Sequence, residues 1–171
     1  IHREEHACNM DMVAINPGGV IGPVLGTDIA GVSADIGVQL LTNAMPSLPH
    51  LAIPMIDVRD VAYIHVKAMT EPAASGKRFI AAHALSHSLL DIATVLNQEG
   101  YPVPTTSCPT WLLRLMSIFN QEAKGMLPYL DKDITCDNSQ TLSLFNWHPI
   151  PFDKTCRDMA KTIQAVLDRH T

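Results

Sequence analysis

The sequence predicts an α/β fold, in which a buried parallel strand is followed by amphipathic helices. Residues 11–16 lie in a short, mostly aliphatic stretch that is typical of a strand buried on both faces. Apolar residues recur at helical spacing over 33–44 and again near the C-terminus, at Cys156, Met159, Ile163, Val166 and Leu167. A buried strand and amphipathic helices in one chain indicate helices packed in layers against a sheet.

The boundaries of the other elements follow from caps, prolines and glycines. A helix at 33–44 should stop near Met45 and Pro46, since the residue before a proline disfavours the helical region. Ser86 and Ser88 are candidate N-caps, as are Asn138 and Ser139. In the first third of the chain we expect a helix end at 1–8, a strand at 11–16, and loops at 22–31 and 46–49 on either side of the helix at 33–44. A strand at 53–56, a helix at 58–70, a turn at 71–76 and a strand at 78–82 should follow. The remaining expected elements are a helix at 89–97, a helix from Pro109, a strand at 134–136, a helix ending near Asn146 and a final helix after Asp153.

The helix at 58–70 carries ionisable residues that we interpret as structural. Asp57 is placed to cap the helix and to form a salt bridge with Arg59, and Asp60 lies in the first turn. His65 falls on the same predicted face as Val61, so we expect a core histidine whose ring nitrogens are satisfied. None of these residues is expected to be catalytic.

Composition excludes several classes of function. The 171 residues are 47% hydrophobic and 17% charged, below the usual quarter, and are enough for one domain with a core. Such an apolar chain either carries a surface meant for a further domain or is an unusually apolar single domain. A net charge of −5 argues against nucleic acid, and no apolar stretch reaches the roughly 18 residues of a membrane span. We therefore expect neither a nucleic-acid nor a membrane partner.

The cysteines and histidines do not predict a metal site. The four cysteines form no Cys-x-x-Cys pair and are expected to be free thiols of a cytoplasmic protein. They are Cys8, Cys108, Cys136 and Cys156. His83 and His87 have the spacing of two zinc ligands on a helix, but they straddle the expected start of the helix at 89–97.

A proline-glycine loop follows the first strand at residues 16–23, NPGGVIGP. Pro17 should end the strand because it has no N–H for the ladder, and Gly18 and Gly19 allow the backbone to turn. Ligands of open α/β sheets bind outside the carboxyl ends of the strands. The loop is therefore either part of a ligand site or a tight turn with no ligand.

Four segments in one order resemble a known family. They are NPGGVIGPVLG at 16–26, DVRDVA at 57–62, GKRFI at 76–80 and FNWHP at 145–149. They are similar to segments of the extended short-chain dehydrogenases/reductases, in the branch that contains dihydroflavonol 4-reductase, cinnamoyl-CoA reductase and aldehyde reductases. The resemblance implies the C-terminal part of a Rossmann-type fold with a smaller α/β substrate-binding subdomain.

Two motifs of that family are absent from the sequence. The phosphate loop Gly-x-x-Gly-x-x-Gly does not occur, and the catalytic pair Tyr-x-x-x-Lys does not occur upstream of the loop at 16–23. Tyr63 and Lys67 have the right spacing, but they lie downstream, and we interpret them as a coincidence. The chain also begins at Ile1. The expectation is a C-terminal half whose partner is the missing N-terminal dinucleotide-binding half, and which is inert alone.

The resemblance also implies domains and a reaction. Residues 1–30 would end the dinucleotide-binding domain, and residues 31–171 would form the substrate-binding subdomain, with 50–70 and 78–82 packing back on the Rossmann core. The parent enzyme would transfer a hydride between NADP or NAD and a small-molecule carbonyl substrate. A homodimer is one assembly that the resemblance allows.

Site residues are carried over by position. Main-chain groups of Pro17, Gly18, Gly19 and Val20 would contact the nicotinamide, and Pro54 and Met55 the substrate. Pro54 replaces a polar residue of the flavonoid enzymes, which favours a smaller or more apolar carbonyl compound. No catalytic residue is expected in the chain. The alternatives are a nucleotide-sugar epimerase or dehydratase, and a stand-alone binding module without catalysis.

Overall fold

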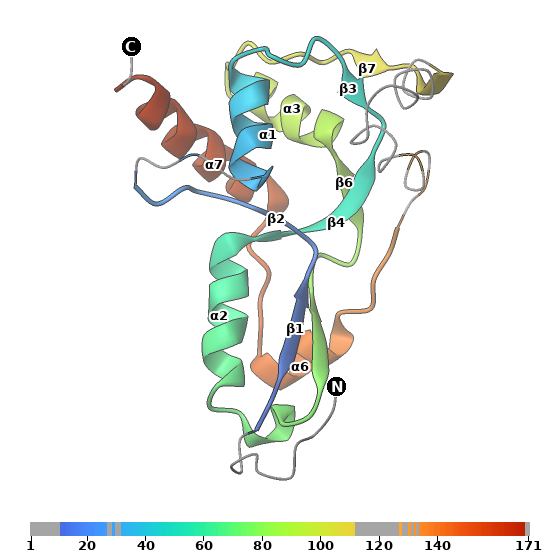
Figure 1. Cartoon of the computed structure of the whole chain (residues 1–171), viewed down its shortest axis with the longest axis vertical. Helices are drawn as coiled ribbons and strands as arrows, with labels where there is room; N and C mark the ends of the chain where they lie inside the picture. The colour runs from blue at the N-terminus through green and yellow to red at the C-terminus, as the bar shows by residue number, and fades with distance from the viewer. Residues whose placement is uncertain are drawn as a thin grey trace, which may run out of the picture.

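The computed structural model describes residues 11–26, 29, 32–111, 127, 130, 132 and 134–169. The expected helix end at 1–8 and most of the helix expected from Pro109 lie outside these residues. Within the described part, the elements form two lobes that meet near the parallel pair of strands β2 and β4 (Figure 1). Each lobe has its own hydrophobic core. The mixed α/β architecture predicted from the sequence is confirmed.

The first lobe is built on two parallel strands. Strand β1 (Ala14–Pro17) pairs with β5 (Arg78–Ala81), so that Ile15 lies opposite Phe79. Helix α2 (Val58–Ala68), helix α6 (Ser139–Phe145) and the short 3₁₀ helix η1 (Pro72–Ala74) complete the lobe. Its core includes Phe79 and Phe145, whose rings meet edge-to-face at 4.7 Å, a favoured geometry for aromatic pairs.

The second lobe is a three-stranded sheet with three helices. Strand β4 (Ala52–Asp57) is central, parallel to β2 (Gly19–Ile21) and antiparallel to β6 (Ser86–Ser88). Helices α1 (Val32–Leu41) and α3 (Leu89–Gln98) both pack against α7 (Phe152–Leu167). The apolar face predicted for the final helix is buried in this core, as the sequence period requires.

A third, two-stranded pairing joins β3 (Leu48–Pro49) to β7 (Ser107–Cys108) in parallel. The expectation of a loop over 46–49 is therefore wrong at Leu48 and Pro49. The strand expected at 134–136 is also wrong, because this segment is extended but has no ladder. A backbone hydrogen bond from the Cys136 N–H to the Ala84 carbonyl, 3.1 Å, ties it to the chain before β6.

The first strand is less buried than its sequence suggests. Ile15 is only half-buried, Asn16 and Pro17 are exposed, and β5 is the one strand that β1 pairs with among the described residues. The expectation of a strand buried on both faces is thus wrong. An aliphatic run predicts that a strand is apolar, but it does not show how many neighbours cover it.

Gly18 and Gly19 do not make a tight turn. The chain leaves β1 at Pro17 and continues directly into β2, changing sheets as it crosses between the lobes (Figure 1). Neither glycine has a positive φ. Instead, a Cβ at Gly18 would lie 2.3 Å from the Pro54 carbonyl oxygen, and one at Gly19 would lie 2.8 Å from the Ile53 Cδ1. Gly18 is needed because two backbones approach closely here, whereas Gly19 lies against the side chain of Ile53.

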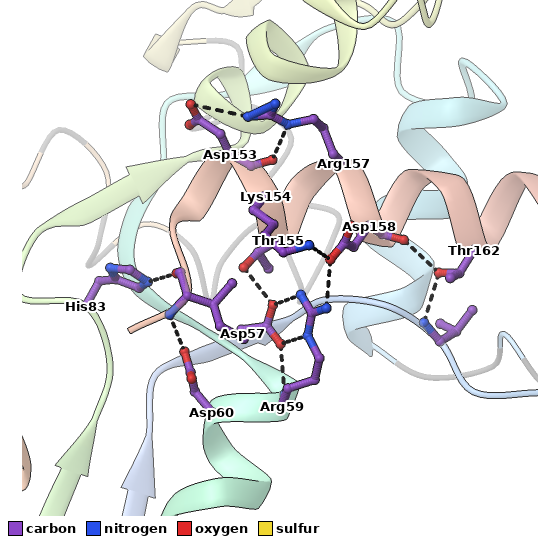
Figure 2. A network of polar contacts seen from close by, with 12 residues as sticks. Asp57, Arg59, Asp60, His83, Asp153, Lys154, Thr155, Arg157, Asp158 and Thr162 are labelled. Atoms are coloured by element: carbon purple, nitrogen blue, oxygen red, sulfur yellow. Dashed lines mark hydrogen bonds and ion pairs between the residues drawn. The ribbon is translucent and has the colours of Figure 1, made fainter. Parts of the chain in front are cut away.

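Asp57 caps α2 and joins it to α7, as Figure 2 shows. Its carboxylate accepts from the Arg59 backbone N–H (2.8 Å) and from Arg59 Nη2 (2.7 Å), and it also accepts from the Thr155 hydroxyl (2.7 Å). Arg59 Nη1 donates to Asp158 on α7 (2.7 Å). The structural role predicted for Asp57 and Arg59 is confirmed, and Thr155 and Asp158 are additions from the far end of the chain.

The predicted core role of His65 is wrong. The side chain is exposed, and Nδ1 lies 2.8 Å from the Val61 carbonyl oxygen one turn earlier. Ile64 is the fully buried residue of that turn. The helix face that meets the sheet is therefore centred one residue earlier than the apolar pattern indicated.

The other caps are partly as predicted. Ser88 and Asp91 form a capping box at the start of α3, whereas Ser86 lies in β6. Before α6, the Asn138 side chain donates to the Ala82 carbonyl (2.7 Å) rather than capping, and Asp137 accepts from the Ser139 N–H instead (3.0 Å). No helix among the described residues is long and apolar enough to cross a membrane.

Candidate functional site

A cleft of about 700 Å³ lies where the two lobes meet. It is lined by the end of β1 and the crossing to β2, by Leu51 and the start of β4, by the end of β5 with Ala82, and by the segment at 134–136. Its position at the carboxyl end of the parallel pair β1–β5 is where ligands of open α/β sheets bind. The lining residues are Asn16, Pro17, Gly18, Gly19, Leu51, Ile53, Pro54, Ile80, Ala82, Ile134 and Cys136.

The fold brings most of the predicted site residues together here. Pro17, Gly18 and Gly19, expected beside the nicotinamide, line the same cleft as Pro54, expected beside the substrate. Val20 and Met55 do not line it: Val20 packs against the core of the first lobe, and Met55 is buried in that of the second. The two side chains point to cores because neighbouring strand residues alternate between faces.

Sequence reasoning missed several lining residues. Asn16 and Ile80 lie in NPGGVIGPVLG and GKRFI, two of the segments that carry the resemblance, but the sequence did not predict either residue as part of the site. Ile134 and Cys136 come from a segment that was interpreted only as a strand. No pattern in the sequence links positions near 134 to positions near 17, because their proximity arises from tertiary packing.

The lining of the cleft is apolar and uncharged. None of its residues is acidic, basic or a histidine, and the polar groups are the Asn16 amide, the Cys136 thiol and main-chain atoms. The Cys136 thiol donates to the His83 carbonyl at 3.2 Å. Burial and the nearby charge of Asp137 raise the pKa of this thiol, which keeps it neutral and poorly nucleophilic. The cleft can bind an uncharged apolar molecule. Its described lining has no tyrosine, histidine, lysine or carboxyl group that could act as a general acid.

The two buried carboxyl groups with shifted pKa values, Asp57 and Asp60, do not line the cleft. Burial opposes ionisation of Asp57, but hydrogen bonds from Arg59 and Thr155 outweigh it and lower its pKa. For Asp60, burial prevails and raises the pKa, although the Ile150 N–H donates to it at 2.8 Å. Both groups connect α2 to the chain around α7, in agreement with the structural roles predicted for them.

The rings of His83 and His87 lie edge-to-face with centroids 6.0 Å apart, and each has a further partner of its own. His83 Nε2 lies 3.1 Å from the Ile150 carbonyl oxygen, and His87 stacks on Phe152 with ring centroids 3.7 Å apart. Burial, with the nearby His83, lowers the pKa of His87. Over the part of the chain that the structure describes, no three acidic, histidine or cysteine side chains gather as metal ligands.

The pair Tyr63 and Lys67 does not belong to the cleft. The Tyr63 hydroxyl donates to the Phe145 carbonyl at 3.1 Å, and Lys67 Nζ lies 5.5 Å from the centre of the Tyr63 ring. Both are on α2 in the first lobe. Their spacing therefore has a structural explanation.

The chain has the fold of the extended short-chain dehydrogenases/reductases and epimerases. It matches a yeast methylglyoxal/isovaleraldehyde reductase complexed with NADPH with a TM-score of 0.68 at 23% identity, over 93% of this chain and 44% of that one. It matches an epimerase of Methanothermobacter thermautotrophicus with a TM-score of 0.68 at 12% identity, over 94% of this chain and 45% of that one. At these identities the likeness establishes the fold.

In sequence, the chain is similar to part of reductases of the cinnamoyl-CoA and dihydroflavonol type. Cinnamoyl-CoA reductase 2 of Arabidopsis thaliana is 35% identical over 100 residues, which are 58% of this chain and 30% of the reductase. A Synechocystis protein named for dihydroflavonol 4-reductase is 32% identical over 109 residues, again 30% of its length. The matched region thus spans about a third of these relatives. No family model matches the chain.

Proposed function

We propose that the chain is the substrate-binding portion of an NAD(P)-dependent carbonyl reductase. The observation that carries this proposal is the single cleft shared by the glycine loop after β1 and by Pro54. The resemblance implies that the glycine loop contacts the nicotinamide and that Pro54 contacts the substrate. Such a reductase brings these two molecules together, so one shared cleft is the arrangement that the reaction needs.

The residues of the cleft fit a flat ring against the backbone. Gly18 and Gly19 have no side chain, and a Cβ at either would already meet β4. Main-chain groups of Pro17 to Gly19, other than the Gly18 N–H that donates to the Ala81 carbonyl, would contact a carboxamide and fix which face of the ring meets the substrate. NADPH or NADH, when bound, supplies the hydride. The chain's own residues position the two molecules and keep the surroundings apolar, which excludes water.

The proton must come from elsewhere. Among the described lining residues there is no tyrosine, histidine, lysine or carboxyl group, and the one thiol, that of Cys136, donates to the His83 carbonyl and has a raised pKa, which makes it a weaker acid. The sequence also lacks the upstream Tyr-x-x-x-Lys pair and the phosphate loop. We therefore propose that this chain alone does not reduce a carbonyl compound.

The edge of β1 suggests where the missing half attaches. The N–H groups of Ala14 and Gly18 bond to the β5 side, so the alternating pattern of a parallel ladder points the Val13 and Ile15 groups to the opposite edge. A groove of about 370 Å³ lines that edge. A further parallel strand there would extend the sheet, and its carboxyl end would lie beside the cleft. Residues 1–30 would then be the last part of the dinucleotide-binding domain, and residues 31–171 would form the substrate-binding subdomain, with 50–70 and 78–82 packing back on the Rossmann core.

A nucleotide-sugar epimerase or dehydratase is the second candidate, favoured by the epimerase among the structural neighbours. Its substrate would carry a pyrophosphate, which calls for arginine or lysine. The described lining has neither. The uncharged cleft supports the reductase. The free thiols found at Cys108, Cys136 and Cys156 are in keeping with a cytoplasmic location.

An NMR titration of the ¹⁵N-labelled chain tests the proposal. Acetophenone, a neutral apolar ketone, should shift the amide signals of residues 16, 18 and 19, with weak affinity of about millimolar order. Galactose, a polar sugar of similar size, is the control and should shift none of them. If acetophenone perturbs only residues far from the cleft, or none at all, the cleft is not a carbonyl site.

A further inference from the structure

The segment at 134–136, here called the strap, forms a wall of the cleft that no sequence motif assigned. It lines the same cleft as the glycine loop, to which it contributes Ile134 and Cys136. Between them, Thr135 is exposed. The strap has no regular secondary structure, so its position depends on side-chain hydrogen bonds.

These hydrogen bonds fix the strap at both ends. The Ser86 hydroxyl donates to the Ile134 carbonyl, and the Cys136 thiol and N–H donate to the carbonyls of His83 (3.2 Å) and Ala84 (3.1 Å). Immediately after it, the Asn138 amide donates to the Ala82 carbonyl, at 2.7 Å. The strap is therefore anchored along the chain that joins β5 to β6, and it cannot slide without losing several bonds.

The glycine loop is also fixed. Gly18 lies against the Pro54 carbonyl with no room for a methyl group, and the Gly18 N–H donates to the Ala81 carbonyl at 3.0 Å. With the glycine loop and the strap both held in place, the side chains that line the cleft set its free width. Leu51, Ile53 and Ile80 also contribute apolar bulk, but Ile134 and Cys136 come from a segment outside the sheets, where side-chain size can change without disturbing a strand ladder.

We propose that Ile134 and Cys136 determine which carbonyl compounds the cleft accepts, by limiting the size of an uncharged, apolar substituent next to the reacting carbonyl. This inference rests on the proposed function and adds its specificity determinants. Ile134 supplies apolar contact. Cys136 is a small residue whose thiol is occupied by the His83 carbonyl, so it leaves space without offering a charge. A larger side chain at this position would fill the space that the substituent needs.

Ketones of graded size test this inference in the full chain. Acetone and acetophenone are titrated separately, and affinities are read from the amide shifts of residues 16, 18 and 19. In Cys136→Leu we expect binding of acetophenone to weaken by about tenfold while binding of acetone changes less than about twofold, since small differences in apolar size discriminate on this scale. Thr135→Leu, which adds the same bulk to the exposed side of the strap, is the matched control and should change neither.

A second variant guards against misfolding. Cys136→Ser keeps the size and a hydrogen-bond donor, so it should retain the preference for acetophenone, and Ile134→Ala should weaken acetophenone more than acetone. The inference is overturned if Cys136→Leu weakens both ketones equally, or neither, while residues 16, 18 and 19 still respond. Absence of any response in the unsubstituted chain overturns the proposed function as well, so the two failures are distinguishable.

Discussion

At the scale of single residues, the carboxyl groups of α2 show how local surroundings set opposite behaviour. Asp57 and Asp60 are three positions apart, and both side chains are buried. Asp57 receives hydrogen bonds from Arg59 and Thr155, so its ionised form is stabilised. Asp60 accepts a hydrogen bond from the Ile150 N–H at 2.8 Å, but burial outweighs it and disfavours the ionised form of Asp60.

Removing the charge of Asp57 should destabilise the fold. Asp57→Asn leaves Arg59 without its buried partner and weakens the helix cap, and we expect the free energy of unfolding in urea to fall by about 3 kcal/mol. Asp158→Asn removes the partly exposed carboxylate that binds the same arginine, and it should cost about 1 kcal/mol or less. A larger loss for Asp158→Asn than for Asp57→Asn would contradict this ranking.

The same two carboxyl groups predict opposite dependence on pH. Because the pKa of Asp57 is lowered on folding, its contribution to stability is present above the unfolded value of about 3.9 and is lost as the pH falls through the folded value. The raised pKa of Asp60 has the reverse sign: it favours the fold at low pH and loses that contribution as the pH rises. Acid unfolding curves should therefore be less steep for Asp57→Asn and steeper for Asp60→Asn. If the acid unfolding curves of the two variants had identical slopes, the opposite pKa shifts of Asp57 and Asp60 would be contradicted.

At the scale of elements, the crossing from β1 to β2 is the feature on which the cleft depends. One strand serves the first lobe and the next serves the second, and the glycines between them let the crossing lie against β4. The cleft forms in the angle between the two strands. Its existence thus follows from close backbone packing rather than from a flexible turn.

A methyl group at the crossing should therefore be costly. Gly18→Ala places a Cβ 2.3 Å from a backbone oxygen that cannot move alone, and we expect a loss of about 2 kcal/mol in thermal or urea unfolding. Gly37→Ala is the control: its Cβ would meet the Cδ1 of Ile163 at 2.4 Å, but that atom ends a flexible side chain, and the helix gains from alanine. Equal stability of the two variants would mean that the crossing can relax.

Hydrogen exchange should reveal the unpaired edge of β1. Amides of Ala14 and Gly18, bonded to the β5 side, are expected to be protected, whereas those of Val13 and Ile15, which point to the other edge, should exchange quickly. Amide-resolved NMR of the chain in heavy water measures all four. Protection of Val13 and Ile15 equal to that of their neighbours would show that the edge is already covered.

At the scale of the whole molecule, the sequence predicted elements better than burial or contacts. Asp57, Ser88 and the apolar face of α7 were readable because capping and periodicity are local. The burial of β1, the exposure of His65 and the wall at Ile134 and Cys136 were not, because each depends on what packs against a segment from a distant part of the chain. Part of the cleft was predicted from the sequence, because the glycine loop and Pro54 belong to or adjoin segments that resemble a known family. The strap was not predicted as part of the site, because no motif includes it.

As proposed, this chain supplies the cleft that binds a carbonyl compound and the nicotinamide ring, but it supplies neither the proton donor nor the phosphate site. The most direct test is one titration of the labelled chain with NADPH and acetophenone, following both the cleft amides and the NADPH absorbance. We expect acetophenone to shift residues 16, 18 and 19, NADPH to bind no more tightly than about millimolar, and no NADPH to be consumed. Micromolar binding of NADPH, or its steady oxidation by this chain alone, would contradict the account.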